Sequence, residues 1–176
     1  MEPATYALCQ KAAIGPALWI AGLCAFPPLI SNLALPLSAA GAAVATSFTV
    51  PVDKNYQFVL QFEFASTEAR LQDSIVGRNY RAECDKEPTS LAGKPEYGRP
   101  IPIQVVIRKA KDRSIVVDEQ FTSLCVLGHA DNRKTRSIGW VALTRGEYTV
   151  EVTNVTAQDG LTTTRTFISL VPGGGK

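Results

Sequence analysis

The residues that could carry out catalysis are few, and they gather in one connector. The only histidine, His129, lies in the segment Leu-Gly-His-Ala-Asp at residues 127–131, four residues after Cys125. A thiolate beside an imidazole that a carboxylate orients is the arrangement of a cysteine hydrolase, so Cys125, His129 and Asp131 define one enzymatic hypothesis. A histidine in a polar loop explains the same residues more simply, and we favour this second interpretation.

Other catalytic and metal-binding patterns are missing from the sequence. Asp118 and Glu119 are adjacent on an expected strand and so point to opposite faces, while Asp85 and Glu87 lie in a long loop. The sequence has no Gly-rich phosphate loop and no Cys-x-x-Cys motif, and one histidine leaves little for a metal site. The sequence therefore predicts a protein that is not an enzyme and that uses neither a metal nor another cofactor.

Two short stretches carry clustered positive charge. They are Arg133, Lys134 and Arg136, and the turn residues Lys109, Lys111 and Arg113. The whole chain has a formal net charge of only +2, so no nucleic-acid partner is predicted. We interpret both stretches as solvated surface. As binding surfaces they would suit an acidic protein or a lipid headgroup.

The first fifty residues differ from the rest of the chain. Residues 12–52 contain no charged residue, and an apolar run over 12–30 is followed by small residues that end in Ala-Val-Ala at 43–45. Signal peptidases accept the Ala-x-Ala form, so the sequence predicts export with cleavage after Ala45. Residues 1–45 would be a signal peptide or an N-terminal membrane anchor, and residues 46–176 the folded domain. An uncleaved anchor would be the only contact with a membrane.

Export changes what the cysteines imply. Cys9 and Cys24 lie in the leader, which leaves Cys84 and Cys125 in the domain. In an oxidising compartment these two are a candidate disulfide, worth about 3–4 kcal/mol for a loop of this length. Two separate buried thiols are the alternative. A disulfide would also remove the nucleophile of the hydrolase hypothesis.

The domain carries the two-residue period of β-strands. In residues 56–65 the aromatic and aliphatic side chains fall on alternate positions: Tyr56, Phe58, Leu60, Phe62 and Phe64. This alternation places one apolar face against a core. Further strands are expected at 47–52, 101–109, 115–121, 137–144, 147–155 and 162–171, with one short helix within 66–76. About seven strands separated by turns predict an all-β fold, an antiparallel β-sandwich.

Two tyrosines have different expected roles. Tyr148 follows the turn at Gly146, and its hydroxyl is expected to bind nearby backbone, which is a structural role. Tyr97 lies in the long connector 78–100, a candidate binding loop because loops on a rigid scaffold often carry binding residues. The candidate contact residues of this loop are Tyr80, Arg81, Lys94, Tyr97 and Arg99.

The order of several motifs resembles one protein family. The motifs are the aromatic strand, the short helix before Gly77, the entry Gly-Arg-Pro-Ile-Pro-Ile at 98–103, and Leu-Thr-Arg-Gly-Glu-Tyr-Thr-Val at 143–150. Over residues 48–171 they resemble an uncharacterised family of exported bacterial β-sandwich proteins, domain of unknown function 5625. The resemblance implies a secreted or lipid-anchored envelope protein and no catalytic residues. This chain departs from a lipid-attachment motif because Leu23 precedes Cys24, where a small residue is needed.

These patterns together predict an exported, non-enzymatic binding protein of the bacterial envelope or periplasm. It would act through protein–protein interaction with an envelope or secreted protein, for example as an immunity or accessory factor to a secreted effector. The alternative is a glycan- or lipid-binding β-sandwich module, for which exposed aromatics such as Tyr97 and Trp140 would be needed. A Cys/His hydrolase is the third hypothesis.

Overall fold

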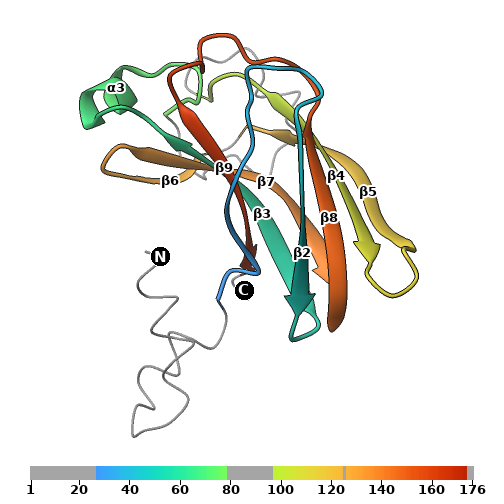
Figure 1. Ribbon diagram of the computed structural model, residues 1–176. Helices are drawn as coiled ribbons and strands as arrows, with labels where there is room; N and C mark the ends of the chain where they lie inside the picture. The colour runs from blue at the N-terminus through green and yellow to red at the C-terminus, as the bar shows by residue number, and fades with distance from the viewer. Residues whose placement is uncertain (1–26, 79–96, 125, 174–176) are drawn as a thin grey trace, which may run out of the picture.

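The computed structural model describes residues 27–78, 97–124 and 126–173, which form nine β-strands and one short α-helix (Figure 1). The elements are β1 (Ile30–Ala34), β2 (Ala43–Val50), β3 (Lys54–Glu63), α3 (Thr67–Gln72), β4 (Ile101–Lys109), β5 (Ile115–Ser123), β6 (Val126–Ala130), β7 (Arg133–Leu143), β8 (Gly146–Asn154) and β9 (Arg165–Pro172). All strand pairs are antiparallel. A five-stranded sheet has the order β1-β9-β3-β7-β6, and a four-stranded sheet has the order β2-β8-β4-β5. The predicted antiparallel β-sandwich is confirmed.

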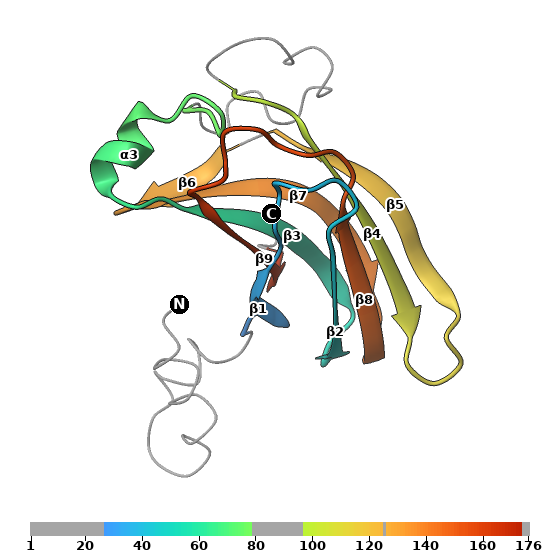
Figure 2. The same ribbon diagram turned by 45° about the horizontal axis from the view of Figure 1, so that its top comes forward.

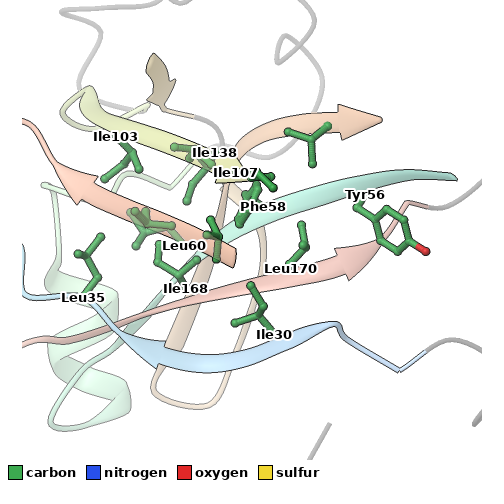
Figure 3. Packing of buried hydrophobic residues seen from close by; sticks show 14 of the residues in the cluster. Ile30, Leu35, Tyr56, Phe58, Leu60, Ile103, Ile107, Ile138, Ile168 and Leu170 are labelled. Atoms are coloured by element: carbon green, nitrogen blue, oxygen red, sulfur yellow. The ribbon is translucent and has the colours of Figure 1, made fainter. Parts of the chain in front are cut away.

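The core lies between the two sheets, and β3 and β4 are central to it. The five alternate side chains of the aromatic strand are all buried: Tyr56, Phe58, Leu60, Phe62 and Phe64. Figure 3 shows Phe58 and Leu60 of β3 together with Ile103 and Ile107 of β4. Burying one such side chain stabilises the fold by roughly 1.5–3 kcal/mol, so this one face of β3 holds a large part of the folding energy.

Tyr148 has the structural role that the sequence predicted. Its hydroxyl donates a hydrogen bond to the carbonyl oxygen of Thr144 at 2.9 Å. Its ring stacks on Phe48 of the neighbouring strand β2, with 5.7 Å between the ring centroids. The hydrogen bond fixes the turn from β7 into β8, and the stacked rings join β8 to β2.

The sandwich begins earlier in the chain than the sequence predicted. β1 pairs with β9, with Ile30 opposite Leu170, and β2 pairs with β8 from Ala43 onwards. Leu35 and Leu37, between these strands, are buried in the core. The predicted domain boundary after Ala45 therefore falls inside β2, and the folded domain starts near Ile30 instead of Thr46. The apolar residues at 30–37 resemble an export segment because a sheet core and a leader both require uncharged residues.

Two further elements differ from the prediction. The sequence pattern predicts no strand between residues 121 and 137, but this region contains β6 and the start of β7. β6 lacks an alternating pattern and exists because it pairs with β7 at the edge of the sheet. The helix α3 is capped by Ser66, whose hydroxyl accepts a hydrogen bond from the amide of Ala69 at 3.2 Å. The helix ends at Gln72, before the predicted end, and has no buried residue.

Candidate functional site

The two ends of the sandwich differ in their construction. We call the end that carries α3 and the segments 73–78 and 97–100 the loop end, which is uppermost in Figure 1. We call the opposite end the turn end. It carries the short connections β2–β3, β4–β5 and β7–β8, which lie lowest in Figures 1 and 2. The predicted binding loop belongs to the loop end.

Two backbone segments cross in close contact at the loop end. The amide of Arg99 donates to the carbonyl oxygen of Ile75 at 2.7 Å. Gly77 and Gly98 both have positive φ, at 89° and 75°. A Cβ on Gly77 would lie 2.5 Å from the carbonyl carbon of Tyr97, and one on Gly98 would lie 2.4 Å from the carbonyl oxygen of Ile75. Only glycine fits at these positions, so the crossing holds the two segments side by side.

A buried ion pair connects this crossing to β7. Lys134 Nζ lies 2.6 Å from Asp73 Oδ2, and the two side chains are only 5% and 6% exposed. The Asp73 carboxylate also accepts the backbone amides of Ile75 and Val76, at 3.0 and 3.1 Å. Lys134 donates a second hydrogen bond to the carbonyl oxygen of Gly77 at 2.7 Å. Because buried charges must be paired and hydrogen-bonded, this pair fixes the position of residues 73–77 on the sheet.

Arg136 holds the second backbone segment of the crossing, residues 97–100, through hydrogen bonds from its buried guanidinium. It is fully buried, and its guanidinium donates to the carbonyl oxygens of Arg99, at 3.0 Å, and of Ser123. Burial lowers the pKa of Arg136 to about 9, and the negative charge of Asp73 opposes part of this lowering. Lys134 and Arg136 occupy alternate positions of β7, so one face of a single strand holds both segments.

The surface of the loop end combines an apolar side chain with oriented arginines. Leu71 of α3 is 59% exposed. Each of three arginines donates to a backbone carbonyl: Arg70 to Asp131 at 2.5 Å, Arg78 to Leu71 at 3.2 Å, and Arg99 to Asp159 at 2.9 Å. We call Leu71, Arg70, Arg78 and Arg99 the arginine rim. Arginine beside an apolar anchor is typical of the residues that dominate protein–protein binding energy.

The predicted loop residues divide between the rim and the interior. Arg99 belongs to the rim, whereas Tyr97 is buried at 5% exposure. Tyr80, Arg81 and Lys94 lie outside the described residues, as do Cys84 and Cys125, so the disulfide stays a prediction. Leu71 was not identified from the sequence, because an apolar residue in a short helix usually faces the core.

The predicted basic patch does not form a surface. Arg133 is exposed and pairs with Glu63 at 2.5 Å, and Glu63 also pairs with Arg165. Lys134 and Arg136 instead point into the protein and are buried. The physical reason is strand alternation: β7 begins at Arg133, four residues before the predicted start, and residues 134 and 136 share the face of Ile138.

The residues of the hydrolase hypothesis lie on the β6–β7 hairpin. His129 and Asp131 are both exposed, and Cys125 lies outside the described residues. The backbone of Asp131 accepts the Arg70 hydrogen bond that orients the rim. Within the described ranges, no group of three or more His, Cys, Asp and Glu residues could hold a metal ion.

A hollow of about 590 Å³ lies at the turn end, between the β4–β5 and β7–β8 connections. Lys109, Lys111 and Arg145 line it together with Glu147. It lies at the opposite end of the sandwich from the arginine rim.

Replacing Gly77 by alanine is expected to destabilise the protein far more than replacing Gly41. Both glycines have positive φ, but a Cβ on Gly41 meets nothing within 4 Å, whereas a Cβ on Gly77 collides with backbone. Gly41→Ala should cost about 1 kcal/mol from conformation alone, and Gly77→Ala roughly 2–4 kcal/mol. Urea unfolding of the two variants measures the difference. Equal losses of unfolding free energy in the two variants would show that the segments 73–78 and 97–100 do not pack closely at Gly77.

Comparison with solved structures supports the fold. A crystal structure of GEBA250068378 from Sulfurospirillum deleyianum is 18% identical, with a TM-score of 0.64, and the match covers 85% of this chain and all of that chain. A Paenibacillus sp. cycloisomaltooligosaccharide glucanotransferase, crystallised with cycloisomaltoheptaose, matches with 15% identity and a TM-score of only 0.36, over 93% of this chain and 19% of that one. The first likeness shows a shared fold, and the second is too weak to support any argument. No curated protein matches the chain.

One family model matches most of the chain. It is the model described as Domain of unknown function (DUF5625), and it matches residues 32–172. The match begins within β1 and ends with β9, in agreement with a sandwich that starts near Ile30. The chain therefore belongs to the DUF5625 family.

Proposed function

We propose that this protein is an exported, non-enzymatic binding protein of the bacterial envelope, and that it binds another protein through its loop end. The observation that carries the proposal is the arginine rim, in which Leu71 is exposed and each of three arginines is oriented by a hydrogen bond to a backbone carbonyl. Three guanidiniums and one apolar side chain suit a partner that presents carboxylates beside an apolar pocket. The exposed carboxylates of Glu68, Asp131 and Asp159 at the same end would face basic groups of that partner. A secreted effector or an envelope protein with such a surface is the proposed partner.

The support beneath the rim favours binding by a preformed surface. The glycine crossing, the Asp73–Lys134 pair and the two hydrogen bonds of Arg136 hold the backbone from which the rim side chains project. A surface that is already ordered loses little conformational entropy when it binds. A buried ion pair adds little net stability compared with apolar packing, so a role in defining one conformation accounts for its presence here.

Export is proposed from the sequence of the N-terminal region. Residues 12–26 carry no charge, as expected for an export segment or membrane anchor. Because β1 and the buried Leu35 and Leu37 belong to the sandwich, we place any processing before Ile30. The envelope or periplasm is the proposed location.

The aromatic side chains give limited support to a glycan-binding module. Tyr97 is buried and therefore cannot stack on a sugar ring. Trp140 is 51% exposed, but it lies on β7 toward the turn end, away from the rim. Among the described residues, the loop end therefore offers no largely exposed aromatic side chain as a platform for a glycan.

The test is capture of a partner from a crosslinked envelope extract, with tagged full-length chain as bait. The wild type should retain one stoichiometric protein. The double variant Leu71→Glu/Arg99→Glu should lose it by roughly thirtyfold, because an apolar anchor and a charge complement are both removed. Ser47→Glu/Gln120→Glu/Thr149→Glu changes the net charge equally at exposed strand positions away from the rim and from the turn end, and should retain the partner. No discrete partner, or equal loss by both variants, would refute binding at the loop end.

A further inference from the structure

Exposed apolar side chains gather at the turn end. Among the described residues five large apolar side chains are exposed, and all but Leu71 lie toward this end: Val52, Ile115, Val116 and Trp140, at 44%, 54%, 40% and 51%. Val52 lies in the β2–β3 connection, the two β-branched residues begin β5, and Trp140 is three residues from the end of β7. Single exposed apolar side chains are ordinary, but a group of them at one end indicates a binding surface.

The connections of the turn end are fastened to one another. The amide of Arg145 donates to Asp53 Oδ1 at 2.5 Å, which joins the β7–β8 and β2–β3 connections. The amide of Ala110 donates to the carbonyl oxygen of Glu147 at 2.9 Å, which joins the β4–β5 connection to β8. Figures 1 and 2 both show these connections at the same end of the sandwich. These hydrogen bonds hold the three connections together, and the exposed apolar side chains lie on or beside them.

Positive charge accompanies these apolar side chains. The cations of the turn end are Lys54, Lys109, Lys111, Arg113 and Arg145, and its carboxylates are Asp53, Asp112 and Glu147. Asp53 accepts the amide of Arg145, and Asp112 accepts both the amide and the hydroxyl of Ser114. Asp118 and Glu119 follow on β5, farther from the turn. The turn end therefore carries a net positive charge around protruding apolar side chains.

The N-terminal region joins the described chain on the Trp140 side of this end. The amide of Leu29 donates to the carbonyl oxygen of Leu170, near the end of β9. A Cβ on Gly173, just after β9, would lie 2.5 Å from Trp140 Cζ3, so the chain entry and Trp140 are close. The 26 residues that precede Pro27 include the uncharged run 12–26. Within the part of the chain that the structure describes, no helix has the length and apolarity to cross a membrane.

We propose that the turn end docks on the surface of an anionic phospholipid bilayer. Trp140, Ile115 and Val116 would enter the interfacial layer, while Lys109, Lys111 and Arg145 would lie at the level of the phosphates. Tryptophan favours the membrane interface, and each lysine or arginine near an anionic surface adds to the attraction. One weak anchor binds a membrane reversibly, so a basic apolar surface beside an apolar tether gives stable attachment. The loop end then faces away from the membrane, toward its partner.

A bilayer explains these observations better than a protein partner does. The apolar side chains project from β5, from β7 and from the β2–β3 connection, and they do not form the flat, continuous patch that a protein partner would cover. The adjoining uncharged segment is itself suited to a membrane. The proposal goes beyond protein binding at the loop end and does not depend on it.

Tryptophan fluorescence of the full-length chain tests the proposal. The chain has two tryptophans, so Trp19→Phe leaves Trp140 as the only emitter. The protein is reconstituted with vesicles of phosphatidylglycerol and phosphatidylethanolamine that contain spin-labelled lipid. Docking predicts a blue shift of Trp140 emission and quenching by the spin label, both reduced at high salt.

Charge reversal separates docking from simple tethering. Lys111→Glu/Arg145→Glu should lower the ratio of quenched to unquenched Trp140 by about tenfold or more. The equal charge change in the rim, Arg78→Glu/Arg99→Glu, should leave quenching intact. If the vesicles retain the chain but Trp140 emission is not quenched, the proposal is overturned. An equal loss of quenching in both double variants would also overturn it. A blue shift that grows with protein concentration in the absence of vesicles would also overturn it, because a second copy would then cover this end.

Discussion

A chain that begins at Thr46 is expected not to fold, whereas a chain that begins at Pro27 is expected to fold and unfold cooperatively. The longer chain keeps β1 and the whole of β2. The shorter chain loses β1, three residues of β2 and the buried side chains of Ile30, Leu35 and Leu37. Truncating one buried leucine or isoleucine costs about 2–5 kcal/mol, and a whole domain is stable by only about 5–15 kcal/mol.

The measurement is circular dichroism of both chains, in the near and far ultraviolet, during thermal unfolding. The chain from Pro27 should give a near-ultraviolet signal that disappears in one transition. The chain from Thr46 should give none at any temperature. If the shorter chain unfolds at the same temperature as the longer one, β1 is not part of the folded domain, and cleavage after Ala45 becomes compatible with the fold.

Replacing Lys134 by methionine is expected to cost about 3–5 kcal/mol of unfolding free energy, because it leaves the carboxylate of Asp73 buried without its cation. The methionine keeps most of the apolar volume of the lysine side chain. The backbone amides of Ile75 and Val76 still bind the carboxylate, but they do not neutralise its charge. Chemical denaturation at pH 7 gives the loss directly.

Two further variants show whether the loss comes from the buried charge. Lys134→Met/Asp73→Asn should recover a large part of the stability, since asparagine keeps an oxygen for the two amides and carries no charge. Arg133→Met is the matched control on the same strand: its ion pair with Glu63 is equally short, but Arg133 is 55% exposed and Glu63 keeps Arg165. It should cost no more than about 1 kcal/mol. Similar losses for Lys134→Met and Arg133→Met would contradict the role given to the buried pair.

The sequence predicted those parts of the fold in which one strand face is apolar and the other polar. β4 has the predicted bounds, and β3 differs from them by two residues at each end, because alternation over nine or ten residues has no helical interpretation. β1 was missed because its neighbours in space, not its own sequence, make it a strand: it pairs with β9 from the far end of the chain. β6 was missed for the same reason, since its pairing with β7 determines its structure.

The candidate site was predictable in its position but not in its chemistry. The long connector indicated the loop end, and Arg99 proved to be part of the rim. Lys134 and Arg136 were read as surface because lysine and arginine are almost never fully buried. A signal was available in their spacing with Ile138, which puts all three on one face of a strand. The partner that makes burial possible, Asp73, is distant in sequence and could be identified only from the fold.

Site-specific photocrosslinking in living cells tests most directly whether this protein works by binding at its loop end. A photoreactive amino acid would replace Leu71 in the rim, and, in a separate strain, Thr149, which is exposed on β8. Binding at the loop end predicts one discrete crosslinked product from position 71 and none from position 149. No product from position 71, or the same product from both positions, would contradict it.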